Sequence, residues 1–202
     1  MSALKKILFA LLLIGSAQLQ AQNLSDLFAK SYAAEKIGSY TEAINAMQAQ
    51  THVAVYEVNL RLGWLYYSSK KHSESVTYYQ KAMVLKPTAT EPLWGLIYPL
   101  IAQEKWNSVE QAYKNILKLD GKNSKANYYL GSIYFYRKDY ANAKKYLQEV
   151  YNLYPFDREA GLLLGWSYYY LGNKVEAKNL FQHVLNNKPD DASALEGLAL
   201  VK

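Results

Sequence analysis

Three histidines and a few acids are the side chains of this sequence that could support acid–base or metal chemistry. His52, His72 and His183 stand far apart, and none has a histidine or glutamate at metal-binding spacing. Cysteine is absent from all 202 residues, so the sequence offers no thiol nucleophile and no disulfide. It also lacks a glycine-rich phosphate loop and a Gly-x-Ser-x-Gly elbow. We therefore expect no enzyme, no cofactor and no metal site.

The charged residues favour helix ends and solvated faces over a functional site. Asp190 and Asp191 precede an apolar run, which predicts a helix start with Asp191 as its N-cap. Glu35 and Lys36 are interpreted as ordinary surface charge. The formal net charge of +6 comes from lysines and arginines scattered over turns and helix ends. Because they form no dense basic stripe, we expect no nucleic-acid partner.

The amino-terminal segment has the organisation of an export signal. Lys5 and Lys6 precede an apolar stretch at residues 7–15, and small residues follow as far as Ala21. We expect residues 1–21 to be a secretory signal peptide and residues 22–202 to be the mature domain. The apolar stretch is well short of the roughly 20 apolar residues of a membrane span and no later stretch qualifies, so we expect no span after cleavage. The signal and the absence of disulfides favour a periplasmic location in a bacterium. An uncleaved anchor is the alternative.

Tyrosine dominates the aromatic residues. The chain has 20 tyrosines and five phenylalanines, and a tyrosine hydroxyl seeks water or a partner even when the ring is covered. The phrase GWSYYYLGN at residues 165–173 nearly repeats LGWLYYSSK at residues 62–70. We expect much of this aromatic surface to be half exposed.

The repetition has a fixed period of 34 residues. Aromatic, small and proline positions step together with a column of leucines, which a chance match would not produce. A period of this size predicts an array of helix pairs. The leucines of the column are Leu62, Leu96, Leu130, Leu164 and Leu198.

Within one unit the spacing is helical. Leu164, Gly165 and Tyr168 share one helix face, and Ala177 and Phe181 share the face of a second helix. A glycine at residue 172 would relieve the backbone in the tight turn between them. Small residues at positions 165 and 177 are expected to let the two helix backbones approach closely.

These motifs resemble the tetratricopeptide repeat family. LGWSY at residues 164–168, AKNLF at residues 177–181 and the closing Pro189 follow the family pattern. The resemblance implies an all-α, right-handed superhelical solenoid of antiparallel helix pairs, with about five repeats and a carboxy-terminal capping helix. The expected repeats are residues 24–55, 56–89, 90–123, 124–157 and 158–191, and the capping helix is 192–201.

Two repeats depart from the pattern. The first has Lys30 and Ser31 where leucine and glycine are expected, and it is two residues short, as a degenerate terminal repeat would be. The third has Pro99 inside its first helix, where proline removes a backbone hydrogen bond at about 3 kcal/mol. We predict a bend or a break between Gly95 and Pro99.

The second stripe of each first helix is more aromatic than a solvated face requires. In the last complete repeat it lies about 200 degrees from the packing stripe. By resemblance, the first helices line the concave surface, so these residues would form one continuous groove with Tyr136 and Tyr170 at its edge. The predicted partner-binding residues are Leu60, Trp64, Tyr67, Trp94, Tyr98, Ile101, Tyr128, Phe135, Tyr136, Leu162, Trp166, Tyr169 and Tyr170.

The expected function is a non-catalytic module that binds a peptide or protein segment as a scaffold or adaptor of the cell envelope. The family's clamp for carboxylates needs lysine, asparagine and arginine on this stripe, whereas this sequence has Leu60 with Trp64 and Leu162 with Trp166. We therefore expect an apolar or aromatic ligand segment. In the alternative, the chain is a constitutive structural subunit whose groove is permanently filled, by its own packing or by a partner such as a second copy in a homodimer.

Overall fold

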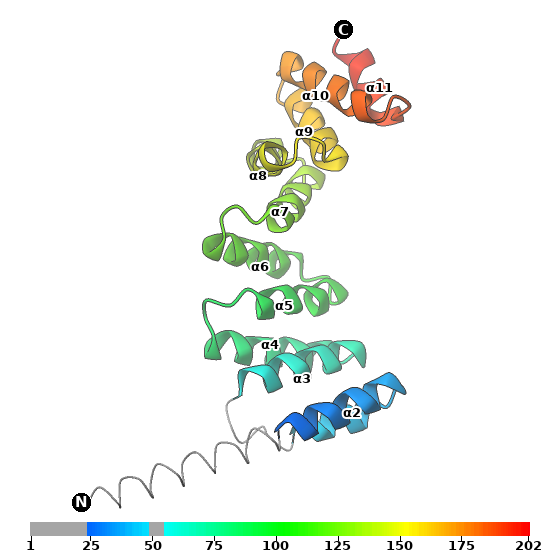
Figure 1. Ribbon diagram of the computed structural model, residues 1–202. Coiled ribbons are helices and arrows are strands. Elements are labelled where there is room, and N and C mark those ends of the chain that lie inside the picture. Colours follow the sequence, from blue (N-terminus) through cyan, green and yellow to red (C-terminus); the bar gives the residue numbers. More distant parts are fainter. Residues whose placement is uncertain (1–23, 49–54) are drawn as a thin grey trace, which may run out of the picture. The chain divides into compact units, whose positions relative to one another are not determined.

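The computed structural model describes residues 24–48 and 55–202, and these residues form α-helices joined by turns (Figure 1). The predicted all-helical fold of packed helix pairs is confirmed. The predicted signal peptide at residues 1–21 lies outside the described residues, as does His52. A first helix spans residues 24–36. The later helices are α2 (Tyr40–Gln48), α3 (Tyr56–Ser68), α4 (His72–Leu85), α5 (Glu91–Ala102), α6 (Trp106–Leu119), α7 (Ser124–Tyr136), α8 (Tyr140–Leu153), α9 (Arg158–Tyr170), α10 (Lys174–Asn187) and α11 (Ala192–Leu200).

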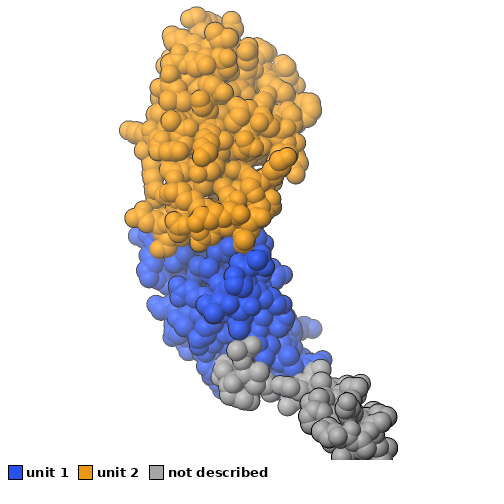
Figure 2. Space-filling view, turned by 90° about the vertical axis from the view of Figure 1, so that its left-hand side faces the viewer, with its two compact units in different colours: residues 1–105 blue, residues 106–202 orange. Residues whose placement is uncertain are grey.

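The chain divides into two compact units, residues 1–105 and 106–202, which Figure 2 colours separately. The division falls between the two helices of the third predicted repeat. In unit 1, α3 packs against α2, α4 and α5, and α4 packs against α5. In unit 2, each helix from α6 to α10 packs against the next one along the chain, and α9 also contacts both α7 and α11. Neighbouring first helices therefore touch within each unit.

The turns between paired helices share one backbone conformation. Gly38, Lys70, Glu104, Lys138 and Gly172 occupy equivalent turn positions, with positive φ angles between 56° and 81°. The turn glycine predicted at residue 172 is confirmed. The other turns hold lysine or glutamate in a region that favours glycine, so these turns carry local strain.

Helix capping differs between the units. Five helices of unit 2, α7 to α11, begin at an aspartate or asparagine whose side chain accepts a hydrogen bond from the first-turn backbone, so the predicted cap at residue 191 is confirmed. The N-cap residues of α3, α4 and α5 in unit 1 make no side-chain cap hydrogen bond. The capping residues of unit 2 are Asn123, Asp139, Asp157, Asn173 and Asp191.

A ring held between two glycines organises the core of unit 1. Tyr79 of α4 lies between Gly63 of α3 and Gly95 of α5. A Cβ atom added at Gly63 would lie 2.9 Å from the Tyr79 ring, and one added at Gly95 would lie 2.2 Å from it. Both glycines are therefore required to make room for this ring.

Unit 2 repeats this arrangement around Phe181 of α10. A Cβ atom at Gly165 of α9 would lie 2.9 Å from the ring, and one at Gly197 of α11 would lie 2.4 Å from it. Gly165 was expected to bring two helix backbones together. The structure fills the space beside it with the fully buried Phe181 ring, and Leu180 Cβ of α10 would lie 3.3 Å from a Cβ atom added there.

Helix α5 runs without interruption from Glu91 to Ala102 although it contains Pro99. The predicted break near Gly95 to Pro99 is therefore wrong, and a bend there stays a prediction. Pro99 has no amide hydrogen, so it cannot bond to the carbonyl of Gly95 four residues earlier. Glycine at residue 95 gives the backbone the freedom to accommodate the pyrrolidine ring. Burial of Pro99 with Leu96 and Leu100 holds the helix in place.

Candidate functional site

All thirteen predicted partner-binding residues lie in the described part of the chain, and each is at least partly exposed. Six belong to unit 1 and seven to unit 2, so they are described as two surfaces. Their role in binding stays a prediction. The exposed members are Trp64, Tyr98, Ile101, Tyr136 and Tyr170, and the half-buried members are Leu60, Tyr67, Trp94, Tyr128, Phe135, Leu162, Trp166 and Tyr169.

The aromatic patch of unit 1 consists of Trp64 and Tyr67 on α3 and Tyr98 and Ile101 on α5. The Tyr67 ring lies 6.0 Å from the Trp64 ring and 5.7 Å from the Tyr98 ring. Because Tyr67 supports both neighbours, Trp64 and Tyr98 stay in place although 43% and 46% of their surface is exposed. The helices thus hold a row of rings with apolar faces open to a partner.

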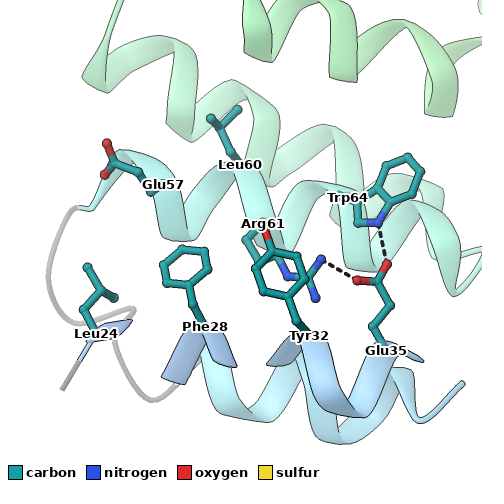
Figure 3. A pocket seen from close by; sticks show the side chains of 8 residues that line it. All are labelled: Leu24, Phe28, Tyr32, Glu35, Glu57, Leu60, Arg61 and Trp64. Carbon is teal, nitrogen blue, oxygen red and sulfur yellow. Dashed lines mark hydrogen bonds and ion pairs between the residues drawn. The ribbon is translucent and has the colours of Figure 1, made fainter. Parts of the chain in front are cut away.

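A pocket of about 620 Å³ adjoins this patch between the helix at residues 24–36 and α3 (Figure 3). We call it the first groove. In Figure 3 the side chains of the helix at residues 24–36 project toward α3, with Glu57 and Leu24 at one end and Glu35 and Trp64 at the other. Its lining residues are Leu24, Phe28, Tyr32, Glu35, Glu57, Leu60, Arg61 and Trp64.

A buried arginine forms one wall of the first groove. The Arg61 side chain is 5% exposed, and its Nη1 atom pairs with Glu35 Oε2 at 2.5 Å. Its Nε atom donates to Ser31 Oγ at 3.1 Å, and the Tyr32 ring centroid lies 3.8 Å from the guanidinium carbon. The Nη2 atom is buried and has no hydrogen-bond partner. Most of the Arg61 charge is therefore neutralised within the protein.

The interpretation of Glu35 as ordinary surface charge is wrong. Its carboxylate binds Arg61 through one oxygen and accepts a 2.6 Å hydrogen bond from Trp64 Nε1 through the other. Ser31, which departs from the repeat pattern, supplies a hydroxyl that a glycine could not. Sequence reasoning missed Arg61. The signal was its charge, because the 34-residue step aligns Arg61 with uncharged residues such as Gly95 and Leu163.

The aromatic patch of unit 2 is held by ring contacts within its own unit, although Tyr136 and Tyr170 remain exposed. Tyr170 stacks on Tyr140 of α8 with ring centroids 4.4 Å apart, and Phe135 lies 5.6 Å from Tyr140. Trp166 stacks on Tyr170 at 6.0 Å, and Tyr169 lies edge-on to Trp166 at 5.5 Å. Tyr140 was not among the predicted residues because it begins a second helix, whereas the predicted surface comprised first helices only.

Helix α11 covers part of this second patch. Trp166 Nε1 donates to Ser193 Oγ of α11 at 2.9 Å, and the Trp166 ring lies 5.0 Å from Phe181. Leu162 and Tyr169 pack against the same core cluster. Leu162, Trp166 and Tyr169 therefore contribute to the core of unit 2 and only partly to its surface.

Tyr128 links two neighbouring first helices of unit 2. Its hydroxyl donates to Glu159 Oε2 at 2.9 Å. Burial, together with this carboxylate, raises the pKa of Tyr128 to about 12, so the phenol stays protonated at neutral pH. Tyr128 acts as a hydrogen-bond donor between α7 and α9 and is not a candidate base.

Two histidines lie in the described residues. His72 begins α4 with its ring 5.7 Å from Tyr67, and His183 Nδ1 shares a 2.6 Å hydrogen bond with the Tyr151 hydroxyl. Across residues 24–48 and 55–202, no group of three or more His, Asp and Glu side chains is placed to hold a metal ion. None of the helices in this same part of the chain is long and apolar enough to cross a membrane.

Comparisons with known proteins agree on one family. Three family models, each described as tetratricopeptide repeat, match residues 56–88, 100–158 and 134–200. A search of curated protein sequences found no match.

Three similar solved structures have the same fold at low sequence identity. A tetratricopeptide repeat protein from Parabacteroides merdae ATCC 43184 has 19% identity and a TM-score of 0.70, and the match covers 89% of this chain and 72% of that one. The MamA protein has 19% identity and a TM-score of 0.68, with 85% and 95% covered. YrrB, described as a TPR protein with an unusual peptide-binding site, has 14% identity and a TM-score of 0.65, with 84% and 89% covered. The helix pairs, the 34-residue period and the three matching models show that this chain belongs to the tetratricopeptide repeat family.

Proposed function

We propose that this protein is a non-catalytic scaffold or adaptor that binds a peptide or protein segment through the aromatic patch of unit 1 and the adjoining first groove. The observation that carries the proposal is the row formed by Trp64, Tyr67 and Tyr98. The half-buried Tyr67 ring contacts both of the other rings, which are exposed to solvent. Aromatic anchors held in place lose little entropy on binding and often dominate an interface. The peptide-binding site named for YrrB supports a peptide as the ligand.

The test is selection of peptides from a displayed random library on the chain from residue 22, followed by calorimetry with the synthetic peptides. Replacing Trp64 and Tyr98 with alanine should weaken binding by at least about tenfold, which corresponds to about 1.4 kcal/mol. Trp106→Ala is the matched control because Trp106 is 48% exposed but begins a second helix. Equal losses in the two variants would contradict the proposal.

The constitutive subunit is distinguished from this proposal by its solution state. Sedimentation should show a monomer, and acrylamide should quench Trp64 in a variant that keeps it as the only tryptophan. A stable oligomer with Trp64 protected would instead support a permanently filled surface.

Export to the bacterial periplasm is part of the same proposal. It is supported by the basic start, the apolar stretch and the small residues that precede residue 22. Expression of the full chain in a bacterium with two membranes should yield a periplasmic protein that begins at Gln22. Retention of the whole chain in the inner membrane would favour the anchor.

A further inference from the structure

The charges of the first groove identify the chemistry of a partner segment more closely than its aromatic rings do. The groove is lined by two carboxylates, Glu35 and Glu57, and one guanidinium, Arg61, which gives it a formal charge of −1. The whole chain has a formal charge of +6. An acidic groove in a basic chain favours cationic ligand groups over anionic ones.

The two ends of the groove are not equivalent. Glu35 is already satisfied, because its two oxygens bind Arg61 and Trp64. Glu57, at the opposite end, is 55% exposed and pairs only with Lys86, which is 51% exposed. An ion pair as exposed as this one is weak, so Glu57 is available to a competing cation.

Glu57 is also held in its charged form. It lies in the first turn of α3, where a helix favours negative charge. Backbone and Lys86 hydrogen bonds keep the pKa of its carboxyl below the usual value. At neutral pH Glu57 is therefore ionised, and Lys86 is the cation that a ligand group would displace from it.

Between the two ends the groove has apolar and polar contacts that suit a peptide chain. Leu24, Phe28 and Leu60 offer apolar surface. The Tyr32 hydroxyl and the exposed Glu57 carboxylate add polar atoms along the same surface. A volume of about 620 Å³ is within the range of sites that hold a few side chains.

We propose that the first groove receives a partner segment in which a lysine or arginine stands beside apolar side chains, with the cation at Glu57 and the apolar side chains over Leu24, Phe28 and Leu60. This inference rests on the proposed function and adds the charge of the ligand. It excludes the acidic tails that the carboxylate clamp of related proteins would hold.

The test uses three synthetic peptides with both ends blocked. They share a Leu-Phe-Leu centre and carry lysine, glutamine or glutamate on both sides. Calorimetry on the chain from residue 22 at low salt should show the lysine peptide binding about fivefold more tightly than the glutamine peptide, and the glutamate peptide binding most weakly. The preference should shrink as salt is added.

Variants of the first-turn glutamates of α3 and α4 locate the effect. Glu57→Gln should reduce the preference for lysine to about twofold or less, and Glu57→Lys should reverse it. Glu74→Gln is the matched control, because Glu74 occupies the first turn of α4 and does not line the groove. It should leave the preference unchanged.

The outcomes separate this inference from the proposed function. Equal binding of the three peptides, or equal effects of Glu57→Gln and Glu74→Gln, would overturn the basic ligand while leaving the binding function in place. Failure of all three peptides to bind at about 1 mM would also overturn it. The proposed function would then be decided by the library selection alone.

Discussion

Trp64 in unit 1 and Trp166 in unit 2 occupy equivalent positions three 34-residue periods apart, yet their surroundings differ. Trp64 is exposed and donates its hydrogen bond to Glu35, on the first helix of the preceding repeat. Trp166 is half-buried and donates to Ser193 of α11, which follows its own repeat. The exposure of equivalent rings in this array therefore depends on the neighbouring repeat as well as on their own repeat.

The two units also distribute their stabilising interactions differently. Unit 2 has side-chain caps on α7 to α11 and an aromatic cluster that its own helices partly cover. The described helices α3 to α5 of unit 1 lack such caps, and its groove contains a buried ion pair. Unit 2 is thus stabilised mainly by helix caps and ring contacts, whereas unit 1 joins its first two repeats through an ion pair that lies beside a pocket.

The largest predicted difference between the units concerns the paired tryptophans. Trp166→Ala should lower the local free energy of unfolding in unit 2 by about 3 kcal/mol, because it removes ring packing and the bond to Ser193. Trp64→Ala should lower that of unit 1 by about 1 kcal/mol, since much of its ring is already in water. Hydrogen exchange of the α3 and α10 amides measures the two losses separately. Equal losses would remove the distinction between the units.

The glycines that flank the buried rings should be sensitive in both units. Gly95→Ala and Gly197→Ala should each cost about 2 kcal/mol, because the new Cβ would overlap Tyr79 or Phe181. In a Tyr79→Leu background the penalty of Gly95→Ala should be smaller, as judged from a double-mutant cycle in urea. Additive effects would show that the ring is not the cause.

The capping difference predicts a stabilising substitution. Lys71, the N-cap residue of α4, has φ −91° and ψ 70°, close to the −86° and 72° of Asp139, which caps α8. Lys71→Asp should raise the free energy of unfolding of unit 1 by about 1 kcal/mol, and Asp139→Ala should lower that of unit 2 by a similar amount. Lys71→Ala controls for loss of the lysine. A gain as large in Lys71→Ala would contradict the capping explanation.

The smallest predicted effect is an acid sensitivity of unit 2. Burial alone would raise the pKa of Glu110, but hydrogen bonds from Lys114, Tyr134 and Arg137 lower it from 4.5 to about 2. The stabilisation is complete above pH 4.5 and is lost as the pH falls through about 2. Because its cationic partners are exposed, we expect less than about 1 kcal/mol. The free energy of unfolding, measured with urea between these pH values, should rise with pH, and Glu110→Gln should remove this rise. A rise that persists in the variant would show that another group causes the pH dependence.

The periodicity predicted the helices because columns that step together every 34 residues encode local spacing. Residue types then placed Gly172 in a turn and Asp191 at a cap. The periodicity could not predict the contact of Arg61 with Glu35, because that contact joins two repeats, one of which is two residues short. It also missed Tyr140, whose ring reaches Tyr170 from a second helix. A period assigns residues to faces, whereas side-chain partners depend on the shapes of neighbouring side chains.

The rings set between paired glycines limit how this array could evolve by recombination. Loss of residues 90–123 would keep the period but bring Tyr129 to the position where Gly95 now faces Tyr79. A junction from the second repeat to α11 would bring Gly197 there instead, and the ring would still fit. Tyr79 and Phe181 each face a glycine in the following repeat, whereas the buried Tyr113 ring stacks on Tyr129 at the equivalent place, so the repeats are not freely interchangeable parts.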